Sequence, residues 1–304
     1  MKNRVIDAIC CVFKLCGIPF LVREVLARNK VTILNYHDPE PNIFEAHLTY
    51  YSKHYNFIHI DNLYEVLRNG SFSNLPPKSL IITLDDGHKG NAALLPIIRK
   101  MGVPVVIYAV AGLVGSRKHF WFRAEGVPKK VIRQAKFLQN SQRIAMLEEQ
   151  YGYIEKNEYP IGHSLSTEEI REFLLAGAIV GCHTMTHPLL PQCDNKVIIE
   201  EITASKILLS ELLGYEVKHF AYPGGAWDAA TYNAVKNADF ATARTICPGF
   251  VTMSTDPLLL PNFGIADNAS LNKAIVQASG IWSLLLYLKP NMRKELAGDY
   301  YVQG

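Results

Sequence analysis

The segment Leu80-Ile-Ile-Thr-Leu-Asp-Asp-Gly87 is an apolar run that ends in two adjacent carboxylates and a glycine. An apolar run of this length predicts a strand that is buried on both faces. Side chains that follow such a strand lie at the carboxyl edge of a parallel sheet, where α/β active sites are found. Asp85 and Asp86 are therefore candidate catalytic residues. A turn or a helix N-cap explains such an acid pair equally well when the pair is taken alone.

The rest of the chain alternates between strand-like and helix-like segments. A capping box from Ser166 to Glu169 begins an amphipathic helix that ends at Gly177. Alternation of this kind predicts an α/β fold with a mainly parallel sheet or barrel. The further β-rich runs are residues 31–36, 104–110, 178–182, 217–222 and 240–246.

Composition excludes several classes of protein. The chain has 304 residues, of which 49% are hydrophobic, so a large buried core is expected rather than disorder. Its 31 Lys and Arg exceed its 28 Asp and Glu by only three, which is too few for a nucleic-acid-binding face. The six cysteines contain no CxxC pair, so neither a thiolate zinc knuckle nor a disulfide framework is predicted.

The chain is expected to divide into three parts. Residues 1–29 form an amphipathic helix, residues 30–280 a catalytic domain with a helical insertion at 115–163, and residues 281–304 a helical tail. The insertion interrupts the strand rhythm, and helical periodicity runs from residue 131 to residue 151. An insertion at a barrel end often shapes substrate specificity, but a solvated helical hairpin is an equal alternative.

The N-terminal helix is a candidate for peripheral membrane contact. Asp7 and Lys14 interrupt its apolar run, so neither a spanning helix nor a cleaved signal peptide is predicted. The first thirty residues carry six Lys or Arg against two acids, which suits anionic headgroups. We expect the protein in the cytoplasm or at the inner face of the membrane; a helix that packs on its own domain is an equal alternative.

A histidine pair follows another predicted strand, in Ile179-Val-Gly-Cys-His-Thr-Met-Thr-His-Pro188. If the chain is helical there, His183 and His187 share a face and can bind one metal ion. Two imidazoles and one carboxylate from another strand leave a coordination position for water, as in catalytic zinc centres.

These segments resemble a known family. Thr83-Leu-Asp-Asp-Gly87 is similar to the T-F-D-D-G motif, and His183-Thr-Met-Thr-His187 to the H-[ST]-x-x-H motif, of the polysaccharide deacetylases (NodB homology domain, carbohydrate esterase family 4). Phe220-Ala-Tyr-Pro-Gly-Gly225 and Leu260-Pro261 resemble later segments of the family. The likeness covers residues 31–266 and implies a distorted (β/α)7-type barrel (NodB-like). It also implies a divalent metal, Zn²⁺ first, with Co²⁺, Ni²⁺ or Mn²⁺ as alternatives.

The resemblance assigns roles to the site residues. Asp86, His183 and His187 would ligate the metal, and Asp85 would be the base that deprotonates the attacking water. This division suits the chemistry, because one carboxylate must lend charge to the metal while the other stays free to accept a proton.

Further residues receive supporting roles from the same resemblance. A backbone N–H in the turn of Tyr222 and Gly224 would stabilise the oxyanion. Thr184 would orient its segment, and His88 would line the sugar site or stack within its loop. For sugar stacking we nominate the aromatic rings of Trp121, Phe122 and Tyr222.

The chain also departs from the family pattern. Two family arginines are replaced by Ala221 and Asn262, so Asp85 needs another cationic partner, for which Arg244 and Arg123 are candidates. The usual C-terminal acid histidine is missing, because no histidine follows residue 219. We therefore predict that His37, which ends a strand in Asn35-Tyr-His-Asp38, is the general acid. A structural strand-end histidine is the alternative.

The function predicted from these residues is hydrolysis of a non-peptide carbon–nitrogen bond. The substrate would be an N-acetyl group on a bacterial-type polysaccharide, a glycan precursor or a lipid-linked sugar. The same site would serve an O-acetyl esterase, and a sugar-unrelated amide hydrolase is a third reading. A non-catalytic glycan-binding descendant would explain Ala221 and Asn262, but it has no need for the acids and histidines.

Overall fold

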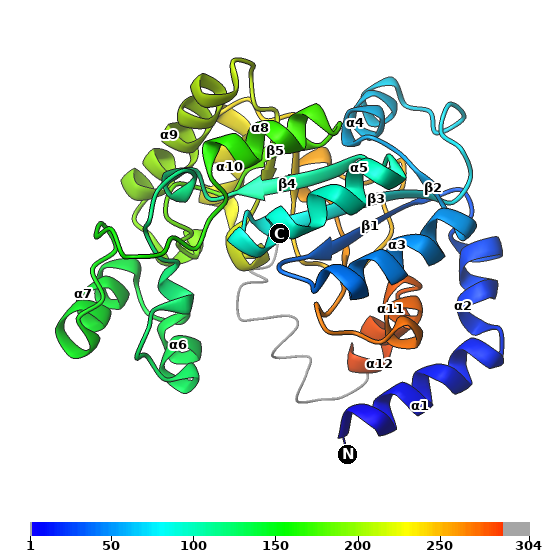
Figure 1. Cartoon of the computed structure of the whole chain (residues 1–304). Helices are drawn as coiled ribbons and strands as arrows, with labels where there is room; N and C mark the ends of the chain where they lie inside the picture. The colour runs from blue at the N-terminus through cyan, green and yellow to red at the C-terminus, as the bar shows by residue number, and fades with distance from the viewer. Residues whose placement is uncertain (1, 288–304) are drawn as a thin grey trace.

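A computed structural model describes residues 2–287, and its centre is one parallel sheet (Figure 1). Within these residues the sheet has eight strands, and seven of them follow the order β7-β6-β5-β4-β3-β1-β8, while β2 also pairs with β3. Every pairing is parallel. The strands are β1 Val31–Tyr36, β2 Asn56–Phe57, β3 Ser79–Asp86, β4 Val105–Ala109, β5 Ile179–Cys182, β6 His219–Ala221, β7 Thr242–Arg244 and β8 Phe263–Gly264.

The sheet curls until its two edges meet. A parallel bridge joins Arg244 of β7 to Leu260, which lies just before β8. Thr245 N donates to Leu260 O at 3.0 Å, and Leu260 N donates to Ala243 O at 2.8 Å. The predicted distorted (β/α)7-type barrel is therefore confirmed, with a weakly paired seam between β7 and β8.

Helices cover the outside of the barrel (Figure 1). The predicted capping box is present, since Glu169 N donates to Ser166 Oγ at 3.1 Å and Ser166 N donates to Glu169 Oε2 at 2.7 Å. The helices around the barrel are α3 Pro41–His54, α4 Ile60–Asn69, α5 Leu95–Met101, α8 Thr167–Leu175, α9 Asn195–Leu213, α10 Ala229–Asn237, α11 Leu271–Ala278 and α12 Ile281–Tyr287. Short 3-10 turns are η2 Lys89–Leu94, η3 Ala111–Leu113, η4 Trp121–Arg123, η5 Leu190–Gln192, η6 Pro223–Gly225 and η7 Pro257–Leu259.

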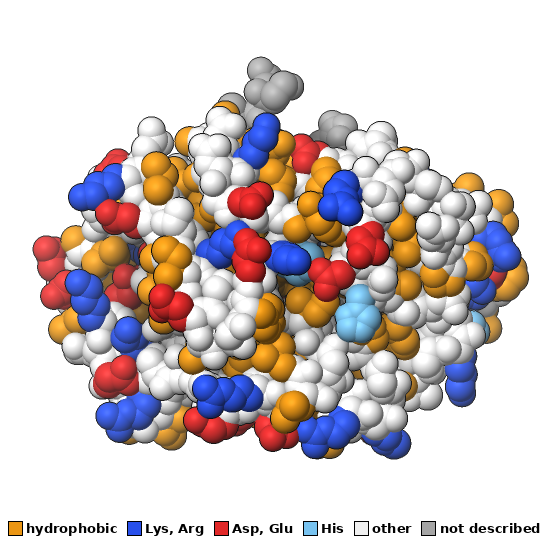
Figure 2. Space-filling view, turned by 90° about the horizontal axis from the view of Figure 1, so that it is seen from above, with side chains coloured by type: hydrophobic (Ala, Val, Ile, Leu, Met, Phe, Trp, Pro, Cys, Tyr) orange, Lys and Arg blue, Asp and Glu red, His pale blue; other side chains and the backbone are white. Residues whose placement is uncertain are grey.

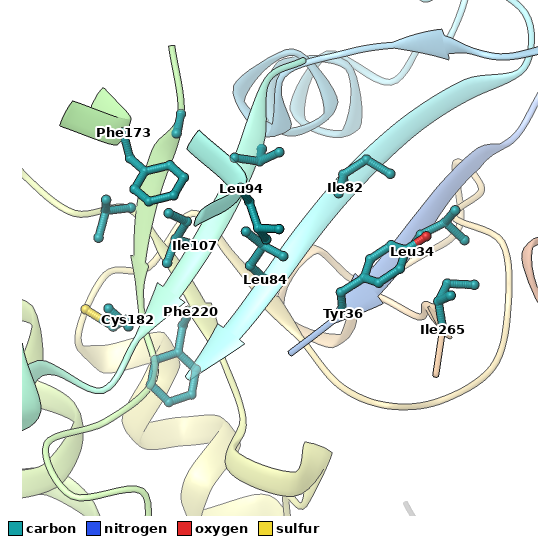
Figure 3. Packing of buried hydrophobic residues seen from close by; sticks show 14 of the residues in the cluster. Leu34, Tyr36, Ile82, Leu84, Leu94, Ile107, Phe173, Cys182, Phe220 and Ile265 are labelled. Atoms are coloured by element: carbon teal, nitrogen blue, oxygen red, sulfur yellow. The ribbon is translucent and has the colours of Figure 1, made fainter. Parts of the chain in front are cut away.

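The two faces of the strands carry different side chains, because successive strand residues point to opposite sides. Leu34, Tyr36, Ile82 and Leu84 belong to the cluster that packs against the helices (Figure 3). The alternate residues of the same strands, such as Ile33 and Ile81, belong to a second buried cluster together with Tyr108, Ala221 and Leu260. The sequence position of Asp85 therefore places its side chain inside the barrel.

The terminal and inserted segments differ from the expected helices. The helical periodicity predicted over residues 131–151 corresponds to two helices, α6 Lys129–Ala135 and α7 Asn140–Tyr151. The N-terminal helix bends at Gly17, whose φ of 73° separates α1 Lys2–Leu15 from α2 Ile18–Leu21 and the π-helical η1 Val22–Leu26. The expected tail begins with α12, and residues 288–304 lie outside the described residues. The division of the chain at residues 29 and 280 stays a prediction.

The strand glycine Gly181 gives a test of packing inside the barrel. A Cβ there would lie 2.7 Å from Tyr108 Cδ1 and 2.9 Å from His219 O. We expect Gly181→Ala to lower the free energy of unfolding by about 1–3 kcal/mol, measured by urea denaturation. Gly264→Ala is the matched control, because a Cβ at that strand position meets no heavy atom within 4 Å. Equal stability of both variants would contradict this account of the interior.

Candidate active site

Three predicted site residues meet at the carboxyl end of the barrel. Asp86 Oδ1 lies 3.3 Å from His183 Nε2 and 3.2 Å from His187 Nε2. All three side chains are buried, and they form a group whose ligand atoms are close enough to hold one metal ion. In a tetrahedral zinc site the ligand atoms lie about 3.3 Å apart, so the observed spacing fits one ion.

The protonation of His183 supports the same reading. Its Nδ1 lies 2.7 Å from the Ala221 carbonyl oxygen, which can only accept a hydrogen bond. A neutral His183 that donates from Nδ1 has only a lone pair at Nε2, and this lone pair faces a carboxylate oxygen. A metal ion between the two atoms satisfies both lone pairs. The donor set of two imidazoles and one carboxylate is one that zinc accepts.

Burial and mutual contact set the charges of this group. For Asp86, burial opposes ionisation, but the imidazoles of His187, His183 and His88 outweigh it and hold the pKa of the carboxyl well below its usual range. Burial lowers the pKa of His187 to about 4, against the opposite effect of Asp86. At neutral pH Asp86 is therefore an anion and His187 a neutral imidazole, which are the forms that bind metal.

The histidine loop is not helical, so the shared helix face considered for the pair is wrong. Thr184 and His187 have φ of 65° and 63°, and Asp86 has φ of 69°. Thr184 holds the turn, since its Oγ1 donates to His183 O at 2.6 Å and accepts from His187 N at 3.0 Å. Positive φ is costly for residues with a side chain, and such strain collects at functional sites.

A residue that the sequence analysis missed supports this loop from outside. Glu201 on α9 accepts from Met185 N at 2.8 Å and from Thr186 N at 2.9 Å, and its other oxygen accepts from Thr186 Oγ1 at 2.7 Å. One carboxylate thus satisfies two backbone amides between the two histidines. Nothing in the local sequence around Glu201 indicates this role, because the contact depends on how α9 packs.

Asp85 precedes Asp86 in the sequence, but its side chain has a different environment from that of the candidate metal ligands Asp86, His183 and His187. Its Oδ2 accepts from Asn35 Nδ2 at 3.1 Å and from the Arg244 guanidinium. Thr83 Oγ1 donates to Asn35 Oδ1 at 3.1 Å and so orients that amide. Within the described residues, Asp85 Oδ1 is buried and has no hydrogen-bond partner. This oxygen is therefore available to accept a proton.

Arg244 is the cationic partner of Asp85, in place of the two family arginines that Ala221 and Asn262 replace. It is buried inside the barrel, and its Nη1 donates to Thr245 O at 2.9 Å. Asn262 also donates to Thr245 O, so it helps to fix the segment that carries Arg244. Arg123, the other candidate, pairs instead with Asp38 at 3.1 Å on the surface.

His88 contacts Asp86, one of the three candidate metal ligands, directly. Its Nε2 lies 2.9 Å from Asp86 Oδ2, the oxygen that does not face the two metal histidines. The edges of the Phe120 and Phe122 rings pack around its imidazole, with centroids at 4.8 and 6.4 Å. Because the His88 side chain is buried, it orients Asp86 rather than offering a surface for sugar stacking.

The turn after β6 carries the two residues expected at the oxyanion. Gly224 has φ of 59°, and Tyr222 N donates to Arg244 O at 3.0 Å, so the Tyr222 amide is already engaged. The Tyr222 ring is 1% exposed and packs edge-on against Phe220, which leaves no face for a sugar. Sugar stacking by Tyr222 is therefore wrong.

The insertion is hydrogen-bonded to the histidine loop, residues 183–187. Trp121 is 1% exposed, and its Nε1 donates to His187 O at 2.8 Å, so it is a structural contact and the stacking role proposed for it is wrong. The Arg143 guanidinium lies 4.3 Å above the Trp121 ring. Phe122 is only partly buried, and its ring lies 4.7 Å from that of His187. Phe122 is thus the nominated aromatic that remains beside the site.

His37 follows β1 directly, at the same edge of the sheet as Asp85. Its backbone is fixed, because His37 N donates to Asp267 Oδ1 at 3.0 Å and His37 O accepts from Asn91 Nδ2 at 2.8 Å. The residue is exposed, unlike the metal group. The structure therefore brings its backbone to the rim of the site, and its role as an acid stays a prediction.

Comparison with solved structures shows the fold. The Streptococcus pyogenes deacetylase PplD, solved with acetate, is 18% identical with a TM-score of 0.61 over 82% of this chain and 98% of that one. IcaB from Ammonifex degensii gives the same identity and TM-score over 82% and 97%. The putative polysaccharide deacetylase BA0330 from Bacillus anthracis is 21% identical, with a TM-score of 0.59 over 82% and 69%.

Sequence comparison shows the family. No curated protein matches the chain. The family model described as polysaccharide deacetylase matches residues 73–243, which is more than half of the sequence and includes both acids and both histidines. The chain therefore belongs to the polysaccharide deacetylase family, and it is a hydrolase that acts on carbon–nitrogen amide bonds in polysaccharides.

Proposed function

We propose that this protein removes an N-acetyl group from a bacterial-type polysaccharide or glycan precursor in a metal-dependent reaction. One observation carries the proposal: Asp86 Oδ1 faces both His183 Nε2 and His187 Nε2 at 3.2–3.3 Å, beside an Asp85 oxygen that has no partner. The products would be acetate and a free amine. Acetate is also the molecule with which the Streptococcus pyogenes deacetylase was solved.

Asp86, His183 and His187 would hold the metal. A divalent ion bound there supplies Lewis acidity that polarises the amide carbonyl and acidifies water. The chain supplies the orientation of the ligands. Ala221 O fixes the His183 tautomer, Thr184 and Glu201 fix the loop, and His88 fixes the second oxygen of Asp86. Partners of this kind commonly change metal affinity by about 10–100-fold.

Asp85 would be the base. Its Oδ1 accepts a proton from the attacking water while Oδ2 stays bound by Asn35 and Arg244. The water oxygen forms a bond to the acetyl carbon, and the bond between that carbon and the sugar nitrogen then breaks. The departing nitrogen needs a proton, which we assign to His37 at the rim. The backbone N–H of Gly224 would stabilise the negative oxygen.

The first prediction separates the base from the ligands. We expect Asp85→Asn to lower acetate release by about 10²-fold or more while the metal content stays unchanged, because the variant loses the proton acceptor but keeps all three candidate metal ligands. His183→Ala should lose both activity and metal. Metal analysis after dialysis and acetate release from a panel of N-acetylated glycans measure the two quantities. Equal metal loss in both variants would show that the division of roles is wrong.

The second prediction concerns the buried ion pair. We expect Arg244→Gln to lower the free energy of unfolding by about 3–5 kcal/mol, because it leaves Asp85 as an unpaired buried charge. The double variant Arg244→Gln/Asp85→Asn should recover most of this loss. Arg123→Gln is the control, since its ion pair is exposed and worth about 1 kcal/mol or less. Additive losses in the double variant would contradict direct coupling.

The third prediction tests His37 as a proton donor. We expect His37→Gln to reduce the rate of amide hydrolysis by about 10²–10⁴-fold, with unchanged metal content. Hydrolysis of an aryl acetate should change far less, because a phenolate leaves without a proton. The exposed His59 gives the control variant His59→Gln. Equal slowing of both substrates would assign His37 a structural role instead.

A further inference from the structure

The N-terminal segment exposes an unusual amount of apolar surface. Among the described residues, twenty large hydrophobic side chains are exposed, and nine of them lie between residues 5 and 26, with exposed fractions of 37–80%. The nine are Val5, Ile9, Val12, Leu15, Ile18, Phe20, Leu21, Val25 and Leu26. We call this set the N-terminal apolar surface. On the face seen from above, Figure 2 shows basic and acidic side chains interspersed.

Helix α1 packs on the domain through Ile6, Cys10 and Phe13, but its outward side is also rich in apolar side chains, whereas a normal surface helix turns a polar side outward. Its polar residues contact the domain: Asp7 Oδ1 accepts from Ser270 Oγ and, at 3.4 Å, from Asn272 Nδ2, and Lys14 Nζ donates to Asn272 Oδ1 at 3.2 Å. Cys10 is fully buried and packs with Val276 of α11 and Ile281 of α12. The outward stripe is therefore apolar.

The segment after the bend has the same orientation. Arg23 is buried, its Nη1 donates to Tyr50 Oη at 2.9 Å, and its Nε pairs with Glu24 at 2.8 Å. Two of the three apolar side chains of η1, Val25 and Leu26, are exposed. Two consecutive helical pieces thus expose apolar side chains, and the exposed basic residues Arg4, Lys14 and Arg28 belong to the same segment.

Charge is concentrated in the same segment. Residues 1–30 contain six Lys or Arg and two acids, a net charge of +4, whereas the whole chain has +3. The remaining residues therefore sum to −1. An apolar surface within a basic segment matches an anionic lipid leaflet, because lipid tails receive the apolar side chains and headgroups pair with the cations. A second copy of the chain would instead bring like charges together.

No single described helix is long and apolar enough to span a membrane, although Arg4–Leu15 and Ile18–Leu26 qualify as a pair that is bent by 56°. We infer that the N-terminal apolar surface lies in the plane of a membrane leaflet rich in anionic lipid, with α1 still packed on α11. This inference does not depend on the proposed function, and it places the deacetylase at a lipid surface.

Flotation of the full chain with lipid vesicles tests the inference. We expect the protein to float with vesicles of phosphatidylcholine containing about one-third phosphatidylglycerol, to float less with pure phosphatidylcholine, and to be released by alkaline carbonate. The triple variant Ile9→Gln/Val12→Gln/Leu15→Gln should bind at least about tenfold more weakly. It should keep its thermal stability, because the replaced side chains contact solvent.

A matched control removes equally exposed apolar residues elsewhere. Ile199→Gln/Ile207→Gln/Leu208→Gln changes three exposed side chains of α9 and should bind vesicles like the parent protein.

Equal binding by the N-terminal triple variant and the parent protein would overturn the inference. A parent protein that is a dimer and does not bind vesicles, together with a monomeric N-terminal triple variant, would show that a second copy occupies the surface. Resistance to carbonate would show a spanning segment. Acetate release from a soluble substrate should be the same in both triple variants, so failure of this inference is distinct from failure of the proposed function.

Discussion

The buried ion pair between Arg244 and Asp85 joins the fold to its chemistry. The two residues lie on β7 and β3, which are separated by three strands in the order of the sheet, so they meet only because the sheet is curled. A flat sheet would leave each charge buried alone, at a cost of several kcal/mol. The same pair occupies one oxygen of Asp85 and leaves the other free. Closure of the barrel and availability of the base are therefore aspects of one contact.

The two departures from the family pattern have structural explanations. The main chain at Ala221 still contributes, because its carbonyl oxygen fixes the His183 tautomer whatever the side chain. Asn262 donates to the Thr245 carbonyl, which also accepts from Arg244. Both positions thus still support the site, while the positive charge itself has moved to a neighbouring strand. The non-catalytic reading loses its main support, since it rested on the absence of that charge.

Strands and acids could be predicted from the sequence, whereas the supporting contacts could not. The β-rich run at residues 79–86 and the capping box at Ser166 depend on nearby residues, and both were predicted correctly. Asn35 lies 50 residues from its partner Asp85 in the sequence, and Glu201 lies 15 residues from its partner Thr186. Their roles follow from strand register and helix packing. The spacing of four between His183 and His187 is compatible with a helix, but the loop that carries them is not helical. Positive φ at Thr184 and His187 produces the same convergence without one.

The hydrogen bond from Trp121 to the His187 carbonyl has an evolutionary consequence. The insertion is the most natural place for a lineage to vary substrate preference, because loops tolerate change better than strands. Here the Trp121 ring of that insertion donates a hydrogen bond to the backbone of His187, a residue of the candidate metal site. Substitutions in the insertion therefore act on the histidine loop as well. An insertion transplanted from a relative would need a compatible histidine loop.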